Sequence, residues 1–323
     1  MTYYAGIDLG GTKTYCVVID EKGNILAREK MKIGTDKNMD HILDIVVECY
    51  KAAVSRSNIT EDDVSAVGMA VPSAVNTEKQ ILLNAPNLGW KNIKIGEIMA
   101  DKLKKPVFVD NDVNLGTFGE YTFGKAKEYK NVYGIFVGTG VGGGYIHGGQ
   151  LVRGASFTAG EIGHMIIKQG GTMCNCGNQG CLEAIAGKVG IIKHIERKIE
   201  EKGKTTKLDE IAPNWRNSVG ASALHKAIKS KDKLTIKAVE RSAEAIGVAC
   251  SNVINTIGVD AIILGGGIIE ELSDIYLPII RLTIQECSMA NGGSNFPVII
   301  SELGDDAVAL GAAWQVVEIY GKK

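Results

Sequence analysis

Three glycine-rich turns, each placed directly after a short apolar run, constrain the fold of this chain most, because they predict strands that end in tight turns. The turns occupy residues 10–13, 138–140 and 265–267. An apolar run, a glycine turn and a second apolar run predict a strand, a sharp turn and a paired strand. The first turn lies in Gly-Ile-Asp-Leu-Gly-Gly-Thr and the second in Gly-Ile-Phe-Val-Gly-Thr-Gly. This similarity predicts an internal duplication, with two strand–turn–strand units facing each other across a cleft.

Helical and extended patterns alternate between these turns. Apolar residues at helical spacing predict helices over 37–57, 235–257 and 308–319. Short apolar runs predict strands over 64–71, 106–109 and 298–301. Such alternation is typical of an α/β protein with layered sheets. The polar segment 200–216 is expected to be an exposed excursion.

The length of 323 residues is more than one hydrophobic core usually serves, which predicts two domains. The smaller α/β domain would comprise residues 1–116 together with a C-terminal helix over 307–323. The larger domain, residues 117–306, would carry a cysteine-rich loop and the second and third glycine turns.

Composition excludes several classes of partner. A formal net charge of −1 gives no bulk attraction to nucleic acid or to an anionic membrane. No apolar run approaches 18 residues, and the first residues lack the pattern of a signal peptide. An odd number of cysteines, seven, favours a reducing compartment over a disulfide framework. We therefore expect a cytoplasmic protein, with buried thiols at Cys16, Cys49, Cys250 and Cys287.

One histidine and three cysteines lie close together in the sequence: His164, Cys174, Cys176 and Cys181. Four nitrogen and sulfur donors at this spacing predict a closed tetrahedral zinc site, which is structural because no position is left for water. The alternative is a reduced loop without metal. Two acidic residues, Glu161 and Glu183, are interleaved with these ligands although zinc does not need them. They indicate that the loop holds a polar ligand.

Five motifs in order resemble the ROK family of sugar kinases. They are 6–13 (Gly-Ile-Asp-Leu-Gly-Gly-Thr-Lys), 110–112 (Asp-Asn-Asp), 138–144 (Gly-Thr-Gly-Val-Gly-Gly-Gly), 161–164 (Glu-Ile-Gly-His) and the cysteine motif 174–183. The resemblance implies a two-domain, actin-like ATPase fold of the ribonuclease H-like class, in which ATP and a sugar meet in the cleft. It also implies a homodimer or a dimer of dimers.

The glycine turns suit phosphate groups, because small residues let backbone N–H groups approach phosphate oxygens closely. The residues expected to bind ATP and its phosphates are Asp8, Gly10, Gly11, Thr12, Lys13, Gly138, Thr139, Gly140, Gly265, Gly266 and Gly267. Asp8 would orient Mg²⁺ through its water shell. By the resemblance, the third turn lies on the adenosine side. The alternative is that the glycines only supply positive φ angles, and that Lys13 is an ordinary exposed lysine.

Asp112 is the expected catalytic base. Transfer of a phosphoryl group to a sugar hydroxyl requires one group that accepts the alcohol proton, and the family pattern gives this role to the second aspartate of 110–112. The alternative is that Asp112 only caps a helix starting near Val113.

The family pattern also implies which residues hold the sugar: Asn87, Asn111, Asp112, Glu161, His164 and Glu183. His164 would place one ring nitrogen on zinc and turn the other toward the sugar. Trp90 is expected in the core. One departure concerns Ser73, because glucokinases of the family often have glycine after the proline at this point.

The expected activity is therefore ATP-dependent phosphorylation of a hexose at the 6-hydroxyl, with glucose as the first candidate. N-acetylmannosamine, N-acetylglucosamine and fructose are alternative substrates. A sugar-responsive regulator is an alternative of another class, since the family also contains repressors. Those carry a helix-turn-helix domain before the first phosphate turn, whereas here that turn begins near residue 6, which favours a kinase. A sugar-binding protein without catalysis is the third alternative.

Overall fold

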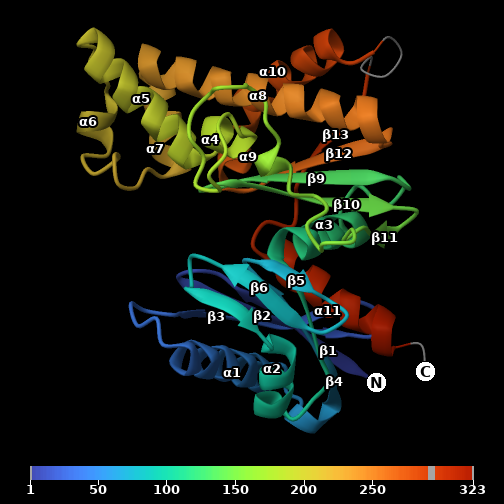
Figure 1. The fold of residues 1–323 in the computed structure, drawn as a ribbon. Helices are drawn as coiled ribbons and strands as arrows, with labels where there is room; N and C mark the ends of the chain where they lie inside the picture. Colours follow the sequence, from blue (N-terminus) through green and yellow to red (C-terminus); the bar gives the residue numbers. More distant parts are fainter. Residues whose placement is uncertain (1, 290–294, 322–323) are drawn as a thin grey trace.

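Two five-stranded sheets of the same topology form the framework of the molecule (Figure 1). The computed structural model describes residues 2–289 and 295–321. The strand order is β3-β2-β1-β4-β8 in the first sheet and β11-β10-β9-β12-β13 in the second. In each sheet the first strand is central, an antiparallel hairpin lies on one side and two parallel strands lie on the other. The predicted internal duplication is confirmed.

The strands have the following bounds. The first sheet contains β1 (Tyr3–Leu9), β2 (Lys13–Asp20), β3 (Ile25–Lys32), β4 (Val64–Val71) and β8 (Val107–Asn111). The second sheet contains β9 (Val132–Val137), β10 (Val141–His147), β11 (Gln150–Leu151), β12 (Ala261–Gly265) and β13 (Val298–Ile300). A small antiparallel sheet contains β5 (Ala74–Asn76), β6 (Ile81–Ala85) and β7 (Trp90–Ile93). Trp90 is buried in the core, as predicted.

Helices cover both faces of each sheet. On the first sheet, α1 (Met39–Arg56) and α2 (Ile95–Leu103) pack on one face, and α11 (Asp306–Tyr320) packs on the other. On the second sheet, α3 (Asp112–Phe123) packs on the face that looks toward α11 (Figure 1). The opposite face carries α4 (Leu182–Ala186), α5 (Lys188–Lys202), α6 (Leu208–Ile211), α7 (Ala221–Lys229), α8 (Lys233–Ile257), α9 (Gly267–Glu271) and α10 (Ser273–Cys287). Two short 3₁₀ turns cover Glu61–Asp63 and Ile162–His164.

Alternation along the central strands explains this layering. In β12, Ile262 and Leu264 belong to the core beneath the helical layer, whereas Ile263 belongs to the cluster around α3. All three side chains are fully buried. Successive strand residues point to opposite faces, so a continuous apolar run is what a sheet covered on both sides requires.

The predicted helices and strands are confirmed. The segment 200–216 is exposed along most of its length, as predicted, but single residues anchor it to the core. Leu208 and Trp215 within it are fully buried, and the Trp215 indole N–H donates to Asp209 at 2.9 Å. The segment is polar because only a few large apolar side chains anchor it.

No helix in the described parts of the chain is both long enough and apolar enough to span a bilayer.

The two sheets are joined where α3 crosses α11. At this crossing the backbones approach so closely that a Cβ on Gly311 would lie 1.8 Å from the Leu115 carbonyl oxygen. A Cβ on Gly119 would lie 2.1 Å from the Ala307 carbonyl oxygen. Glycine is therefore required on both helices, because any side chain would push the helices apart.

The linker from β13 to α11 is held at both ends. Glu120 of α3 is 2% exposed and accepts hydrogen bonds from the Ser301 hydroxyl at 2.6 Å and the Leu303 N–H at 2.8 Å. At the start of α11, Asp306 accepts from the Tyr15 hydroxyl at 2.5 Å and from both Nε and Nη2 of Arg28. These contacts fix the linker to the second sheet at one end and to the first sheet at the other.

The predicted domain boundary at residues 116 and 117 falls inside α3, and this division stays a prediction.

Replacing Gly311 with alanine is expected to lower the free energy of unfolding by about 1–3 kcal/mol, because the methyl group overpacks the α3–α11 crossing. Urea unfolding followed by circular dichroism measures this. Gly220→Ala is the control, since its Cβ would meet only the Ser222 hydroxyl at 3.6 Å, and loss of glycine from the N-cap of α7 should cost less than about 1 kcal/mol. Equal stability of the two variants would contradict the close-approach argument.

Candidate functional site

The expected catalytic aspartate lies where β8 ends and α3 begins. The N-cap of α3 is Asn111, whose Oδ1 accepts from the Val113 and Asn114 N–H groups at 2.9 and 3.0 Å. Asp112 is the first residue of the helix and is partly exposed. The capping role proposed as the alternative for Asp112 is therefore filled mainly by its neighbour, although Asp112 Oδ1 also lies 2.9 Å from the Val113 nitrogen.

Three carboxyl groups from different elements crowd this point. The pKa of Asp112 is raised to about 7, first by desolvation and then by the charges of Asp8 and Glu161, against a hydrogen bond from the Val113 N–H. The pKa of Asp8, near the end of β1, is raised to about 6, again mainly by desolvation, and the charge of Lys13 opposes the rise. A group whose pKa lies near neutral pH and which has like charges close by is a candidate general base.

Glu161 brings the second half of the molecule to the same place. It precedes the 3₁₀ turn that ends at His164. Although the residue as a whole is exposed, packing around the carboxyl group raises its pKa; His164 opposes the rise and Glu183 adds to it. Electrostatic interactions thus connect Asp112 to Asp8 of the first sheet and to Glu161. Glu161 in turn interacts with His164 and Glu183.

The four predicted metal ligands are also brought together. The donor atoms of His164, Cys174, Cys176 and Cys181 all lie within 4.8 Å of one another. The Cys176 and Cys181 sulfurs are 3.7 Å apart, and the Cys174 sulfur is 3.8 Å from His164 Nδ1. A tetrahedron with Zn–S bonds of about 2.3 Å has sulfur–sulfur edges of about 3.8 Å. The residues therefore fit zinc, with Nδ1 of the histidine toward the metal and Nε2 on the other side of the ring.

Glu183 connects this loop to the second glycine turn. Its Oε1 lies 3.8 Å from the Cys174 sulfur, and its Oε2 accepts from the Val141 N–H at 3.1 Å. A Cβ on Gly140 would lie only 2.0 Å from the same Oε2. A side chain at position 140 would therefore displace this carboxylate from the Val141 N–H.

The first and second glycine turns each contain a glycine with open space beside its backbone. Neither Gly11 nor Gly138 has a positive φ angle, and a Cβ on either would meet nothing within 4 Å. Thr12 and Thr139 beside them are exposed. The fold does not require glycine at positions 11 and 138, which contradicts the alternative that these glycines only serve the turn. The open space suits a ligand that approaches the backbone closely.

The third turn differs, because part of it serves the fold. Gly266 has φ of 86°, and its Cβ would lie 2.6 Å from the Val137 carbonyl oxygen. Gly265 pairs with Phe136 of β9, so this turn lies beside the second turn at the same edge of the sheet. Gly267, the first residue of α9, has open space around its Cβ position.

Three other predicted positions have distinct surroundings. Lys13 forms an ion pair with Asp305 at 3.2 Å, in the loop before α11. Asn87 is an exposed residue in the turn between β6 and β7, and none of its described contacts ties it to Asp112. Ser73 is 5% exposed, and its carbonyl oxygen accepts from the Asn111 Nδ2 at 3.2 Å, so it lies next to the N-cap of α3.

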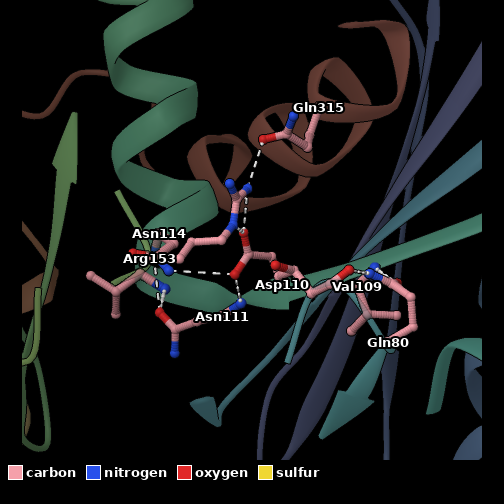
Figure 2. Close-up of polar contacts among 9 residues, drawn as sticks. Gln80, Val109, Asp110, Asn111, Asn114, Arg153 and Gln315 are labelled. Atoms are coloured by element: carbon pink, nitrogen blue, oxygen red, sulfur yellow. Dashed lines mark hydrogen bonds and ion pairs between the residues drawn. The ribbon is translucent and has the colours of Figure 1, made fainter. Parts of the chain in front are cut away.

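Sequence reasoning missed the polar network directly behind Asn111. Figure 2 shows the Asp110 carboxylate between the guanidinium of Arg153, the Asn114 amide and the backbone of Asn111, with Gln315 of α11 on the far side of the arginine. Asp110 is part of the 110–112 motif, but its position in the motif does not reveal its partner. Arg153 is separated from it by more than 40 residues, and the sequence carries no signal that pairs them.

Comparison with known proteins agrees with this geometry. A family model described as the ROK family matches residues 4–319. A glucokinase of Halalkalibacterium halodurans is 29% identical over 97% of this chain and 94% of its own length. A ROK family glucokinase from Streptomyces griseus, solved with glucose and AMPPNP, has a TM-score of 0.80 and 28% identity, and the match covers 97% of this chain and 98% of that one.

Regulators of the family are equally similar. A xylose repressor of Caldicellulosiruptor bescii is 29% identical, and the match covers 97% of this chain and 77% of the repressor. A ROK family transcriptional regulator described as a homolog of the E. coli MLC protein has a TM-score of 0.83 at 25% identity, covering 96% of this chain and 76% of that one. The predicted two-domain, actin-like ATPase fold is confirmed. Similarity over nearly its whole length shows that the chain belongs to the ROK family.

Proposed function

We propose that this protein is an ATP-dependent sugar kinase that phosphorylates a hexose at the 6-hydroxyl, and that glucose is its first candidate substrate. One observation carries the proposal. Asp112, a carboxyl group with a pKa of about 7, lies within the electrostatic reach of Asp8 and Glu161. Those two residues come from the two halves of a duplicated fold whose glycine turns offer bare backbone at positions 11 and 138.

Asp112 would act as the general base. Its carboxylate takes the proton of the sugar hydroxyl as the hydroxyl oxygen bonds to the terminal phosphorus of ATP, and the bond from that phosphorus to the bridging oxygen of ADP breaks. A base with a pKa near the working pH combines a large ionised fraction with useful basicity. Mg²⁺ would neutralise charge on the transferred group, and the carboxylate of Asp8 suits its water shell.

The sugar would be held by amide, carboxylate and imidazole groups around this base. Hexose hydroxyls both donate and accept hydrogen bonds, and Asn111, Glu161, His164 and Glu183 together offer both kinds of partner. Asn87, in the β6–β7 turn, is included on family resemblance alone. The ATP phosphates would meet the turns at residues 10–13 and 138–140, and the third turn would lie toward the adenosine.

Zinc would stabilise the loop that carries these sugar contacts. Bound by His164 Nδ1 and three sulfurs, it would fix the imidazole ring and leave Nε2 for a sugar hydroxyl, as supporting contacts fix ligand rings in metal sites. The metal takes no part in the chemical step in this proposal. A homodimer or dimer of dimers is a further proposal from the family resemblance.

A panel of sugars tests the proposed reaction. With ATP and Mg²⁺, the protein should release ADP in the presence of glucose, N-acetylmannosamine, N-acetylglucosamine or fructose, and glucose should give the highest kcat/KM. If another sugar gives the highest kcat/KM, that sugar replaces glucose as the proposed substrate and the proposed reaction stays the same. Sugar binding without ADP release from any of them would favour the regulator or the sugar-binding protein.

Asp112→Asn should lower kcat by at least about 100-fold, because the base is lost while its shape is kept. In the wild-type protein, kcat/KM for the sugar should rise with pH up to about 7, as Asp112 loses its proton, and this acidic limb should be absent from the residual activity of the variant.

Stability serves as the control for folding of Asp112→Asn. A carboxyl group whose pKa is raised on folding destabilises the fold once it ionises, so this cost is absent at low pH and complete above the folded pKa. The ligand-free variant should therefore be at least as stable as the wild type at pH 8. A variant with wild-type kcat would show that Asp112 is not the base.

Cys176→Ala should lose zinc and weaken sugar binding, because the loop loses one of four ligands. Metal analysis of the purified wild type should find about one zinc per chain. Cys287→Ala is the matched control: that thiol was expected to be buried but is exposed and lies outside the cluster. Zinc-free wild-type protein with full sugar affinity would contradict the proposal.

A further inference from the structure

An ion pair links the two sheets two residues before the proposed base. Asp110 of β8 belongs to the first sheet and is 1% exposed. Arg153 lies in the loop that follows β11 of the second sheet. Both Nε and Nη2 of the arginine are 2.7 Å from Asp110 Oδ2, and Figure 2 shows the guanidinium pointing at this carboxylate.

The other oxygen of Asp110 holds the strand end that carries the site. Its Oδ1 accepts from the Asn111 N–H at 2.7 Å and lies 3.4 Å from the Asn114 side-chain nitrogen. The carboxylate therefore stands between the guanidinium and the backbone of the residue next to Asp112. A shift of Arg153 would be passed to that backbone through a single side chain.

The backbone of Arg153 holds the loop that carries Glu161. Its carbonyl oxygen accepts from the Ala159 N–H at 3.1 Å, which closes the loop two residues before Glu161. The next residue, Gly160, packs on β10 so tightly that its Cβ would lie 2.8 Å from the Gly143 carbonyl oxygen. Arg153 and Glu161 are thus parts of one loop that is closed by a backbone hydrogen bond and packed on β10.

Two further contacts orient the guanidinium. Nη2 donates to Gln315 of α11 at 3.2 Å, and the guanidinium lies over the Phe108 ring at 5.8 Å from its centroid. The planar group is therefore held by a strand, by a helix and by its own loop. Lysine offers neither the two-nitrogen fork nor the flat stacking surface.

We propose that Arg153 is a positioning residue, which through Asp110 sets the distance between the base Asp112 and the sugar contact Glu161. The inference rests on the proposed function, since it assigns those two roles. A buried ion pair contributes little net stability compared with apolar residues of similar volume. Its effect here is geometric: it ties together two groups from different sheets that must act on one sugar, where a displacement of 1 Å is costly.

The first test compares the kinetics of Arg153→Met with those of the wild type. The sugar kcat/KM should fall by about 10- to 100-fold through both a higher sugar KM and a lower kcat, while the KM for ATP stays unchanged. A purely structural role predicts a different result, because partial unfolding lowers the active fraction and leaves both KM values as they were. That result would overturn the proposal.

The second test separates stability from positioning. Arg153→Met leaves an unpaired carboxylate at Asp110, which destabilises the fold. The double variant Arg153→Met/Asp110→Asn removes this charge and should regain unfolding temperature without regaining the sugar kcat/KM. Recovery of both would mean that Arg153 acts only through stability. If Arg153→Met does not fold, the Arg153→Lys variant tests the positioning role instead. A raised sugar KM with an unchanged ATP KM supports positioning, and wild-type values for both KM values reject it.

A matched control exists elsewhere in the chain. Arg216 also pairs with an aspartate, Asp209 at 2.9 Å, and lies over an aromatic ring, that of Trp215, at 4.5 Å, in the helical layer around α6. Arg216→Met should leave the kcat and both KM values of the wild type unchanged. An equal rise in sugar KM for this variant would show a general effect of losing an arginine–aspartate pair and would reject the specific role.

Calorimetric titration with the sugar alone keeps this inference distinct from the proposed reaction. A wild type that binds sugar but releases no ADP rejects the kinase, and weaker sugar binding by Arg153→Met would still support the positioning of Glu161. Conversely, an active wild type with an equally active and equally tight-binding Arg153→Met variant rejects the positioning role alone.

Discussion

The α3–α11 crossing is the constraint on which the rest of the structure depends. Each helix covers the inner face of one sheet, so the separation of the sheets is the separation of these two helices. That separation is set by bare glycine backbone facing carbonyl oxygens, at Gly311 against Leu115 and at Gly119 against Ala307. Because α3 begins at Asp112, the same contact that joins the halves also places the proposed base between them.

Charge is concentrated at this junction at a cost to stability. Asp8 and Asp112 carry raised pKa values mainly because they are desolvated, and each is raised further by a neighbouring carboxylate. A fold selected only for stability would separate these groups or pair them with cations. The crowding is understandable if cations and a sugar occupy the region during function. A cation would offset the repulsion, and sugar hydroxyls would hydrogen-bond to the desolvated carboxylates.

Local sequence patterns predicted most of the fold. The glycine turns and the apolar runs before them predicted the strands, and the similarity of two short stretches predicted the duplicated topology. The polar segment 200–216 is mostly exposed, as its composition predicted, but composition alone does not show that Leu208 and Trp215 anchor it to the core. Burial of single large residues in a polar stretch depends on tertiary neighbours, which periodicity does not report.

The candidate site was predictable where its residues lie within short motifs and not where they lie far apart. His164 and the three cysteines span fewer than 20 residues, and their spacing predicts a zinc site. Arg153 and Asp110 meet only because β8 and the loop after β11 are brought together by the fold. The N-cap of α3 is Asn111 rather than Asp112, because the side-chain oxygen of Asn111 is placed to accept from two backbone N–H groups.

The position of α11 along the chain has a consequence for biosynthesis. This helix covers Tyr4, Val17 and Ala66 of the first sheet, yet its residues leave the ribosome some 300 positions after β1. Until then one apolar face of the amino-terminal sheet has no cover, and the nascent chain presents an incomplete core to solvent. The core beneath this face is therefore completed by a helix made long after the sheet, and removal of α11 would expose the face again.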